Sequence, residues 1–196
     1  MNPDPGPLPE KPMTLRELES HLIPLRAFLN ETAPGTREAA LRTNARRREL
    51  TAFQAYLFAR IHGTLFGTRD ILTVQIIEAI DYDALIDWKN GTKSEQLRLQ
   101  LKELVSPEWN KKSGSAEAEL ATLLNGLPVK YPKATDLTVG IYANYGSTYM
   151  NAVPPANLQL GGLWVFGWAN QERSRLFIAG GKQGEHRFFE PEQLPA

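Results

Sequence analysis

Residues 70–89 read DILTVQIIEAIDYDALIDWK, and the secondary structure of this stretch decides the fold. It is rich in isoleucine and other apolar residues, a composition that favours buried strands. Asp81-Tyr82-Asp83 is typical of a turn, so the stretch predicts a hairpin with strands at 70–77 and 84–89. A buried helix over 70–80 is the open alternative, because periodicity does not separate helix from strand in a short apolar run.

The beginning of the chain alternates proline with polar residues, and we expect 1–13 to be a disordered, proline-rich tail. A helix is predicted to begin at Thr14, because Thr14 and Glu17 form a capping box. Pro24 removes one hydrogen bond of this helix, which predicts a kink or a break.

The remaining patterns are helical first and mostly β after Gly126. Helices are expected at 36–61, with Gly63 as the residue that terminates the helix, and at 94–105 and 116–124. Strands are expected at 137–142, 158–168, 174–179 and 185–189. The sequence therefore predicts an α+β fold, in which a helical N-terminal half packs on a mainly antiparallel C-terminal β-sheet. Residues 14–196 would form a single domain, and a sub-boundary at 113–127 is the alternative.

Composition bounds the functional classes. The chain has 196 residues, of which 42% are hydrophobic, and its 22 lysines and arginines equal its 22 aspartates and glutamates, so no global attraction to nucleic acid is expected. Cysteine is absent, which excludes disulfides, thiolate nucleophiles and cysteine-ligated zinc. The N-terminus lacks the pattern of a signal peptide and no apolar run has membrane-spanning length, so a cytoplasmic protein without a membrane partner is expected.

One group of residues has the side chains that a catalytic site would need. If the hairpin forms, Asp87 and Lys89 share one face of its second strand, and Asp70 can lie near them on the first strand. Two carboxylates can hold Mg²⁺, which prefers oxygen ligands, and Lys89 can stabilise charge that develops on a phosphate. Glu49, on the preceding helix, is a candidate for a further ligand.

This arrangement resembles the PD-(D/E)xK nuclease superfamily. The pattern there is an aspartate at a strand start and an acidic-x-lysine triplet on the next strand, followed by a helix. Asp70, Asp87-Trp88-Lys89 and the helix expected at 94–105 match it, with Arg69 where the family often has proline. The resemblance implies a metal-dependent nuclease or a degenerate relative, with Asp70 and Asp87 as Mg²⁺ ligands and Lys89 and Glu49 as further catalytic residues.

Nucleic acid is the partner that this hypothesis requires. Arg42, Arg46 and Arg47 are candidates for phosphate contacts, and Arg42 and Arg46 share a helix face. A solvated helix face is the alternative interpretation of this arginine cluster.

The second functional class is a non-catalytic interaction protein, such as an inhibitor, an immunity factor or an assembly subunit. It would bind a protein partner through the C-terminal β-sheet. Trp164, Phe166 and Trp168 share one face of an expected strand, and they would serve as a binding platform only if that face were exposed. Apolar residues on both faces of the strand favour a buried core position instead.

Overall fold

The computed structural model describes residues 8–31, 44–65, 71–77, 81–105, 114–144, 153–170, 174–181 and 184–191. Within these ranges the helices are α1 (Leu15–Glu31), α3 (Asn44–Leu65) and α4 (Ala116–Lys130). The strands are β1 (Ile71–Ile76), β2 (Ala84–Asn90), β3 (Lys93–Val105), β4 (Ala134–Asn144), β5 (Leu160–Trp168), β6 (Leu176–Gly180) and β7 (Glu185–Phe189).

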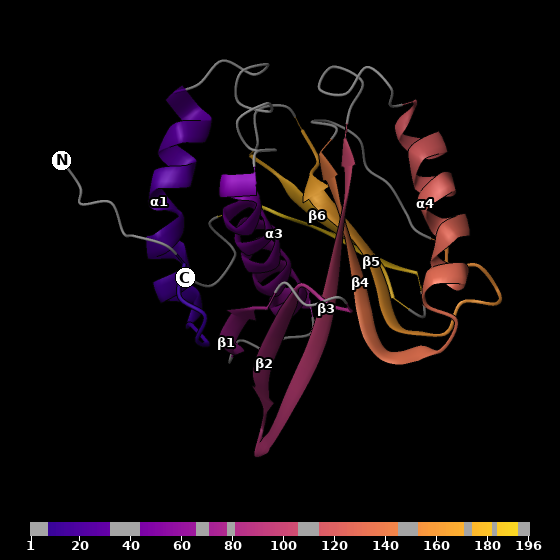
Figure 1. Ribbon diagram of the computed structural model, residues 1–196, viewed down its shortest axis with the longest axis horizontal. Coiled ribbons are helices and arrows are strands. Elements are labelled where there is room, and N and C mark those ends of the chain that lie inside the picture. The colour runs from indigo at the N-terminus through magenta and orange to yellow at the C-terminus, as the bar shows by residue number, and fades with distance from the viewer. Residues whose placement is uncertain are drawn as a thin grey trace.

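All seven strands form one mixed sheet, and their order in space is their order in the sequence. Strand β2 is antiparallel to both β1 and β3, and β6 is antiparallel to both β5 and β7. The central strands β3, β4 and β5 run parallel to one another, with α4 in the connection from β3 to β4. Figure 1 shows this sheet edge-on between its helices.

Helices cover both faces of the sheet. Helices α1 and α3 pack on one face and α4 on the other (Figure 1). The α3 side is the larger core and buries Phe58, Tyr142 and Phe166, among others. The α4 side buries Leu120, Val139 and other residues, half of them from β4 and β5. The fold is therefore a three-layer sandwich of helix, sheet and helix.

The predicted fold class was wrong. The helices are distributed along the chain, so there is no helical N-terminal half, and the sheet is mixed rather than mainly antiparallel. Two parallel pairings at the centre of the sheet account for the difference. Between β3 and β4, the connection through α4 returns the chain to the end of the sheet at which β3 began, so β4 runs in the same direction as β3.

The largest local error concerns residues 94–105, which form β3 and not a helix. Leucine, arginine, glutamine and lysine all favour helices, which made the helical pattern convincing. The stretch from Gln96 to Lys102 nevertheless alternates strictly between polar and apolar residues, and the apolar ones, Leu97, Leu99 and Leu101, are buried under α3. Tertiary packing of this alternating face overrides helix propensity.

Several local predictions were confirmed. β1 and β2 form the predicted hairpin, which removes the alternative of a helix over 70–80. The Thr14 amide donates to Glu17 Oε2 (2.8 Å), and the Glu17 amide to Thr14 Oγ1 (3.2 Å), as in a capping box. Trp164 and Phe166 lie in the core and Trp168 packs against it, which leaves no exposed aromatic platform on β5.

Helix ends were predicted less well. Helix α1 continues through Pro24, α3 continues past Gly63 to Leu65, and α4 continues past Gly126 to Lys130. Favourable packing against the sheet outweighs the local breakers in each case.

Part of the predicted tail lies against the sheet. Residues 8–13 are described, and the backbones of Met13 and Val74 exchange two hydrogen bonds of 3.0 and 2.7 Å. The Met13 side chain is buried in the α3-side core.

No helix among the described residues is long and apolar enough to cross a membrane.

Candidate functional site

The site is built around Asp83, the residue that immediately precedes β2. Strand β2 begins at Ala84, which pairs with Leu99, whereas β3 continues to Val105. The Asp83 amide donates to the Leu99 carbonyl (2.8 Å), and Asp83 Oδ2 accepts a hydrogen bond from the Leu101 amide (2.6 Å). The carboxylate thus takes the place of a backbone carbonyl where the β2–β3 ladder ends.

Gln100 is the second member of the site. Its amide nitrogen Nε2 donates to Asp83 Oδ2 and more weakly to the Leu101 carbonyl oxygen (3.4 Å). Its amide oxygen Oε1 accepts a hydrogen bond from the Tyr131 hydroxyl (2.9 Å). Gln100 is only 5% exposed, and Tyr131, which follows the last residue of α4, is buried beside it. Buried polar groups of this kind are hydrogen-bonded because their desolvation is costly.

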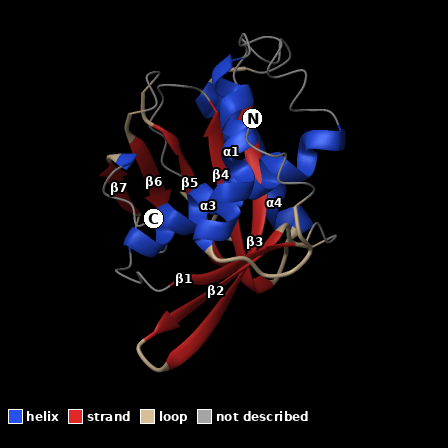
Figure 2. Cartoon of the chain, turned by 90° about the vertical axis from the view of Figure 1, so that its left-hand side faces the viewer, coloured by secondary structure: helices blue, strands red, loops and turns tan. Residues whose placement is uncertain are grey.

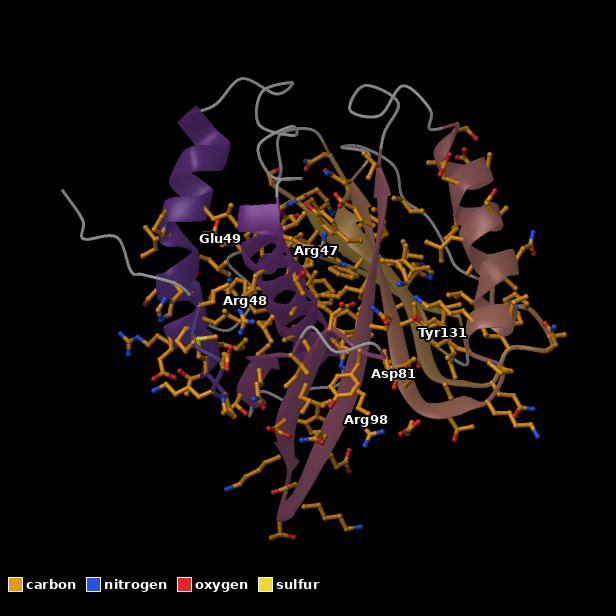
Figure 3. The ribbon with its side chains drawn as sticks, in the orientation of Figure 1. Arg47, Arg48, Glu49, Asp81, Arg98 and Tyr131 are labelled. Atoms are coloured by element: carbon orange, nitrogen blue, oxygen red, sulfur yellow. The ribbon has the colours of Figure 1, made fainter. Side chains whose placement is uncertain are left out.

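Positive charges surround this pair. Lys102 lies on the same face of β3 as Gln100, because the two are two positions apart in a strand. Lys130 lies at the end of α4, with its ammonium nitrogen 5.2 Å from the centre of the Tyr131 ring. Arg47 is in the first turn of α3, and Figure 3 shows it and Tyr131 on opposite sides of β3.

Burial favours the neutral forms of the Asp83 carboxyl group and of the Lys102 amino group. Burial raises the pKa of the Asp83 carboxyl group, although its hydrogen bond from the Leu101 amide and the charge of Lys102 act in the opposite direction. Burial also lowers the pKa of the Lys102 ammonium group, and the nearby positive charge of Lys130 lowers it further. A hydrogen bond with Tyr131 is the main reason why the pKa of Lys130 is raised.

The residues predicted from the sequence lie mostly elsewhere. Asp87 is four residues further along the chain, within β2, and its carboxylate accepts hydrogen bonds from Thr73 Oγ1 (2.9 Å) and Gln96 Nε2 (2.8 Å). Lys89 is exposed and lies still nearer to the tip of the β2–β3 hairpin, which projects from the body of the protein (Figure 2). Asp70 lies outside the described residues.

Only one of the predicted residues of α3 approaches the site. The positive charge of Arg47 influences both Asp83 and Lys102. Glu49 is two residues further, about 200° around the helix, and lies toward α1 in Figure 3. Arg46 belongs to α3, but its side chain is outside the description, and so is the whole of Arg42.

Sequence reasoning missed Asp83, Gln100, Lys102 and Tyr131. Asp83 was assigned to a turn, and Gln100 and Lys102 to a helix, in which residues two apart point in different directions. The signal that could have found them is the alternation from Gln96 to Lys102, which places Gln100 and Lys102 on one face of a strand.

Two oxygens of the site face the Gln100 amino group, namely Asp83 Oδ2 and the Leu101 carbonyl oxygen, whereas the Gln100 amide oxygen faces the Tyr131 hydroxyl. Mg²⁺ suits such a set, because it binds through one or two carboxylates and keeps several waters. No cluster of three or more His, Cys, Asp or Glu side chains arranged to hold a metal occurs in the described part of the chain. The two oxygens are of the type that hard cations prefer, but the site has a single carboxylate, and Lys102 and Lys130 add positive charge beside it.

No protein-family model matches the chain, and comparison with curated proteins and with solved structures likewise gives no match. The chemistry of the site is accordingly derived from its own residues.

Proposed function

We propose that the protein is a metal-dependent nuclease, or a degenerate relative of one, that acts at Asp83, Gln100 and Lys102. The observation that supports it most directly is the convergence of a half-buried carboxylate with a lysine whose pKa is lowered by burial. Titratable groups with shifted pKa values often mark functional sites. The predicted cytoplasmic location and a nucleic-acid partner belong to the same proposal.

The order of elements around this site is similar to the PD-(D/E)xK pattern. Asp83 immediately precedes β2, Gln100-Leu101-Lys102 provides the triplet on the next strand, and α4 follows. Helix α3 precedes the hairpin and β4 follows α4, an order that also suits the core of that superfamily. The departure is Gln100, an amide where the pattern has a carboxylate, so a cation there would have one acidic ligand fewer.

Mg²⁺ would be held by the Asp83 carboxylate and the Leu101 carbonyl, with waters in the remaining positions. A bound Mg²⁺ would supply Lewis-acid activation of a phosphate and of water. Asp83 also holds the Leu101 amide, so the backbone that carries this carbonyl is fixed in place.

Lys102 is the candidate for proton transfer and charge stabilisation. A lysine whose pKa is lowered gives up its proton more readily than an ordinary lysine, and in the neutral form its amine could accept a proton from an attacking water or orient that water. In its charged form it can stabilise the negative charge that develops on phosphate. Arg47 and Lys130 add positive charge that would attract a phosphodiester backbone.

The test is a cleavage assay with double-stranded DNA, single-stranded DNA and RNA, each with Mg²⁺, Mn²⁺ or a chelator. We expect metal-dependent cleavage that falls at least about 100-fold in Asp83→Asn and in Lys102→Gln. Asp87→Asn is the matched control, because it changes an aspartate on the same face of β2 outside the site, and it should retain activity within about twofold.

Absence of cleavage by the native protein on every substrate would refute the proposal. Cleavage that survives in both Asp83→Asn and Lys102→Gln would equally remove these residues as a catalytic set. The alternative of a protein-binding module has no specific support, because the aromatic residues of β5 that suggested it are packed into the core.

A further inference from the structure

The last residues of β3 run past the end of the neighbouring strand β2. Strand β2 begins at Ala84, which pairs with Leu99, whereas β3 continues to Val105 and pairs there with β4 on its other side. In the described part of the chain, no strand therefore lies beside Lys102 on the side of β2. The Lys102 side chain is half-buried at this edge and is accessible to a molecule from solution.

Three positive side chains meet at this edge, and each comes from a different element. They form a basic cluster of Arg47 from α3, Lys102 from β3 and Lys130 from α4, in which Arg47 and Lys130 are exposed. A hydrogen bond joins the side chains of Lys102 and Lys130, and the charge of Arg47 acts on Lys102. Lys130 Nζ lies 5.2 Å from the centre of the Tyr131 ring, so the buried tyrosine holds it in place.

A contact between two lysines is unfavourable by itself. A charged lysine has three donors and no acceptor, so two charged lysines repel each other, and a hydrogen bond between them requires that one is neutral. The position of Lys130 at the end of α4 suits the helix dipole, but the dipole does not require a second lysine beside it. An anion accepts hydrogen bonds from both ammonium groups, which turns their repulsion into a shared attraction.

The charge of the basic cluster fits a dianion. Its members contribute three positive charges and Asp83 contributes one negative charge, so these four side chains have an excess of two positive charges. A proton passed from Lys102 to Asp83 leaves this excess unchanged. An internal phosphodiester carries one negative charge, whereas a phosphate monoester carries about −1.5 to −2 at pH 7 and has three acceptor oxygens. The monoester therefore neutralises the cluster more completely.

We propose that the basic cluster of Arg47, Lys102 and Lys130 binds the terminal phosphate monoester of a nucleic-acid strand. The inference rests on the proposed function, because it takes nucleic acid as the substrate of the same site and specifies which of its phosphates is recognised. Binding of this phosphate places the end of the strand beside Asp83. The protein then selects strands that end in a phosphate over strands that end in a hydroxyl group.

Fluorescence anisotropy with short, labelled single strands tests this selection. A chelator is present throughout, so that metal-dependent cleavage does not interfere. One strand has a 5′-phosphate and one a 3′-phosphate, and the unphosphorylated strand is two nucleotides longer, which gives it about the same total charge. We expect the native protein to bind one of the phosphorylated strands at least about tenfold more tightly than the longer strand.

A methyl ester of the same terminal phosphate tests the match to a dianion. It keeps the phosphate in place and removes one negative charge, so most of the tenfold preference should be lost. An ester that binds as tightly as the free terminal phosphate would overturn the assignment of a monoester.

Two lysine variants locate the binding site. We expect Lys130→Gln and Lys102→Gln each to reduce the preference for the phosphorylated strand to about threefold or less. Because Lys130 is exposed, its replacement tests the charge without disturbing the core. Lys89→Gln is the matched control, since it removes the charge of an exposed lysine near the end of β2 outside the cluster, and it should keep the full preference.

Equal affinity of the native protein for all three strands would overturn the proposal. A preference that survives in both Lys102→Gln and Lys130→Gln would equally remove the basic cluster as the binding site. Selective binding of the phosphorylated strand without cleavage in the metal-containing assay would contradict only the nuclease proposal. Cleavage without selective binding would contradict only the recognition of the terminal phosphate.

Discussion

Two aspartate–glutamine pairs join β2 to β3, and they differ in what covers them. In the outer pair, near the hairpin tip, Asp87 faces an exposed Gln96. In the inner pair, Asp83 binds Gln100, which Tyr131 covers from the end of α4. The residue types are the same and both aspartates are half-buried. The chemistry of the inner pair therefore comes from its surroundings, namely the buried glutamine, the end of the ladder and the neighbouring lysines.

The largest expected difference between the two pairs is in stability. Asp83→Ala leaves the Leu101 amide and the buried Gln100 amino group without their acceptor, and unsatisfied buried donors are costly. We expect a loss of about 2–3 kcal/mol in the free energy of unfolding. Asp87→Ala should cost only about 0.5 kcal/mol, because its partner Gln96 is exposed and water can replace the lost contact.

Urea denaturation of the native protein and both variants measures this difference. Similar losses in the two variants would mean that the inner pair is as accessible to water as the outer one.

A smaller effect is expected from the covering residue. Tyr131→Phe removes the donor to Gln100 Oε1 and keeps the ring, so we expect a loss of about 1 kcal/mol in the free energy of unfolding. Tyr82→Phe is the matched control. It removes a hydroxyl from a half-buried ring that packs against the same core, and Arg98 contacts that ring through its face.

A loss in Tyr131→Phe no larger than that in Tyr82→Phe would show that the hydroxyl contributes nothing to holding Gln100. Thermal denaturation of the two variants in parallel is sufficient to decide.

The smallest expected effect is a pH dependence that belongs to Asp83. Its pKa is raised in the folded protein above the ordinary value of 3.8, so the folded state binds the proton more tightly than the unfolded state. The corresponding stability is present below pH 3.8 and is lost as the pH rises through the raised pKa. Relative to the native protein, Asp83→Asn should therefore gain stability over this interval and show no further change at higher pH.

Chemical denaturation of both proteins at a series of pH values gives the difference between their unfolding free energies. A difference that stays constant, or that changes in the opposite direction, would contradict a raised pKa.

The sequence predicted the hairpin of β1 and β2 because its β-branched residues and its turn favour the same structure. It failed at β3, where helix-forming residues occupy a strand that packing against α3 stabilises. That error also hid the site. In a helix, Gln100 and Lys102 would point about 200° apart, whereas in β3 they share a face beside Asp83.

Tyr131 could not have been predicted from local patterns. Its contact with Gln100 joins residues 31 positions apart and depends on the parallel pairing of β3 with β4. Such pairings follow from the packing of the whole sheet and leave no short-range mark in the sequence.

The bridge between Met13 and Val74 has a consequence for solubility. The outer edge of a sheet offers unpaired amide and carbonyl groups to any other extended chain, and proteins protect such edges to avoid aggregation. By exchanging both hydrogen bonds with Val74, Met13 closes β1 at its middle. A shortened protein that begins after residue 13 would leave this position of β1 open and should aggregate more readily than the full chain.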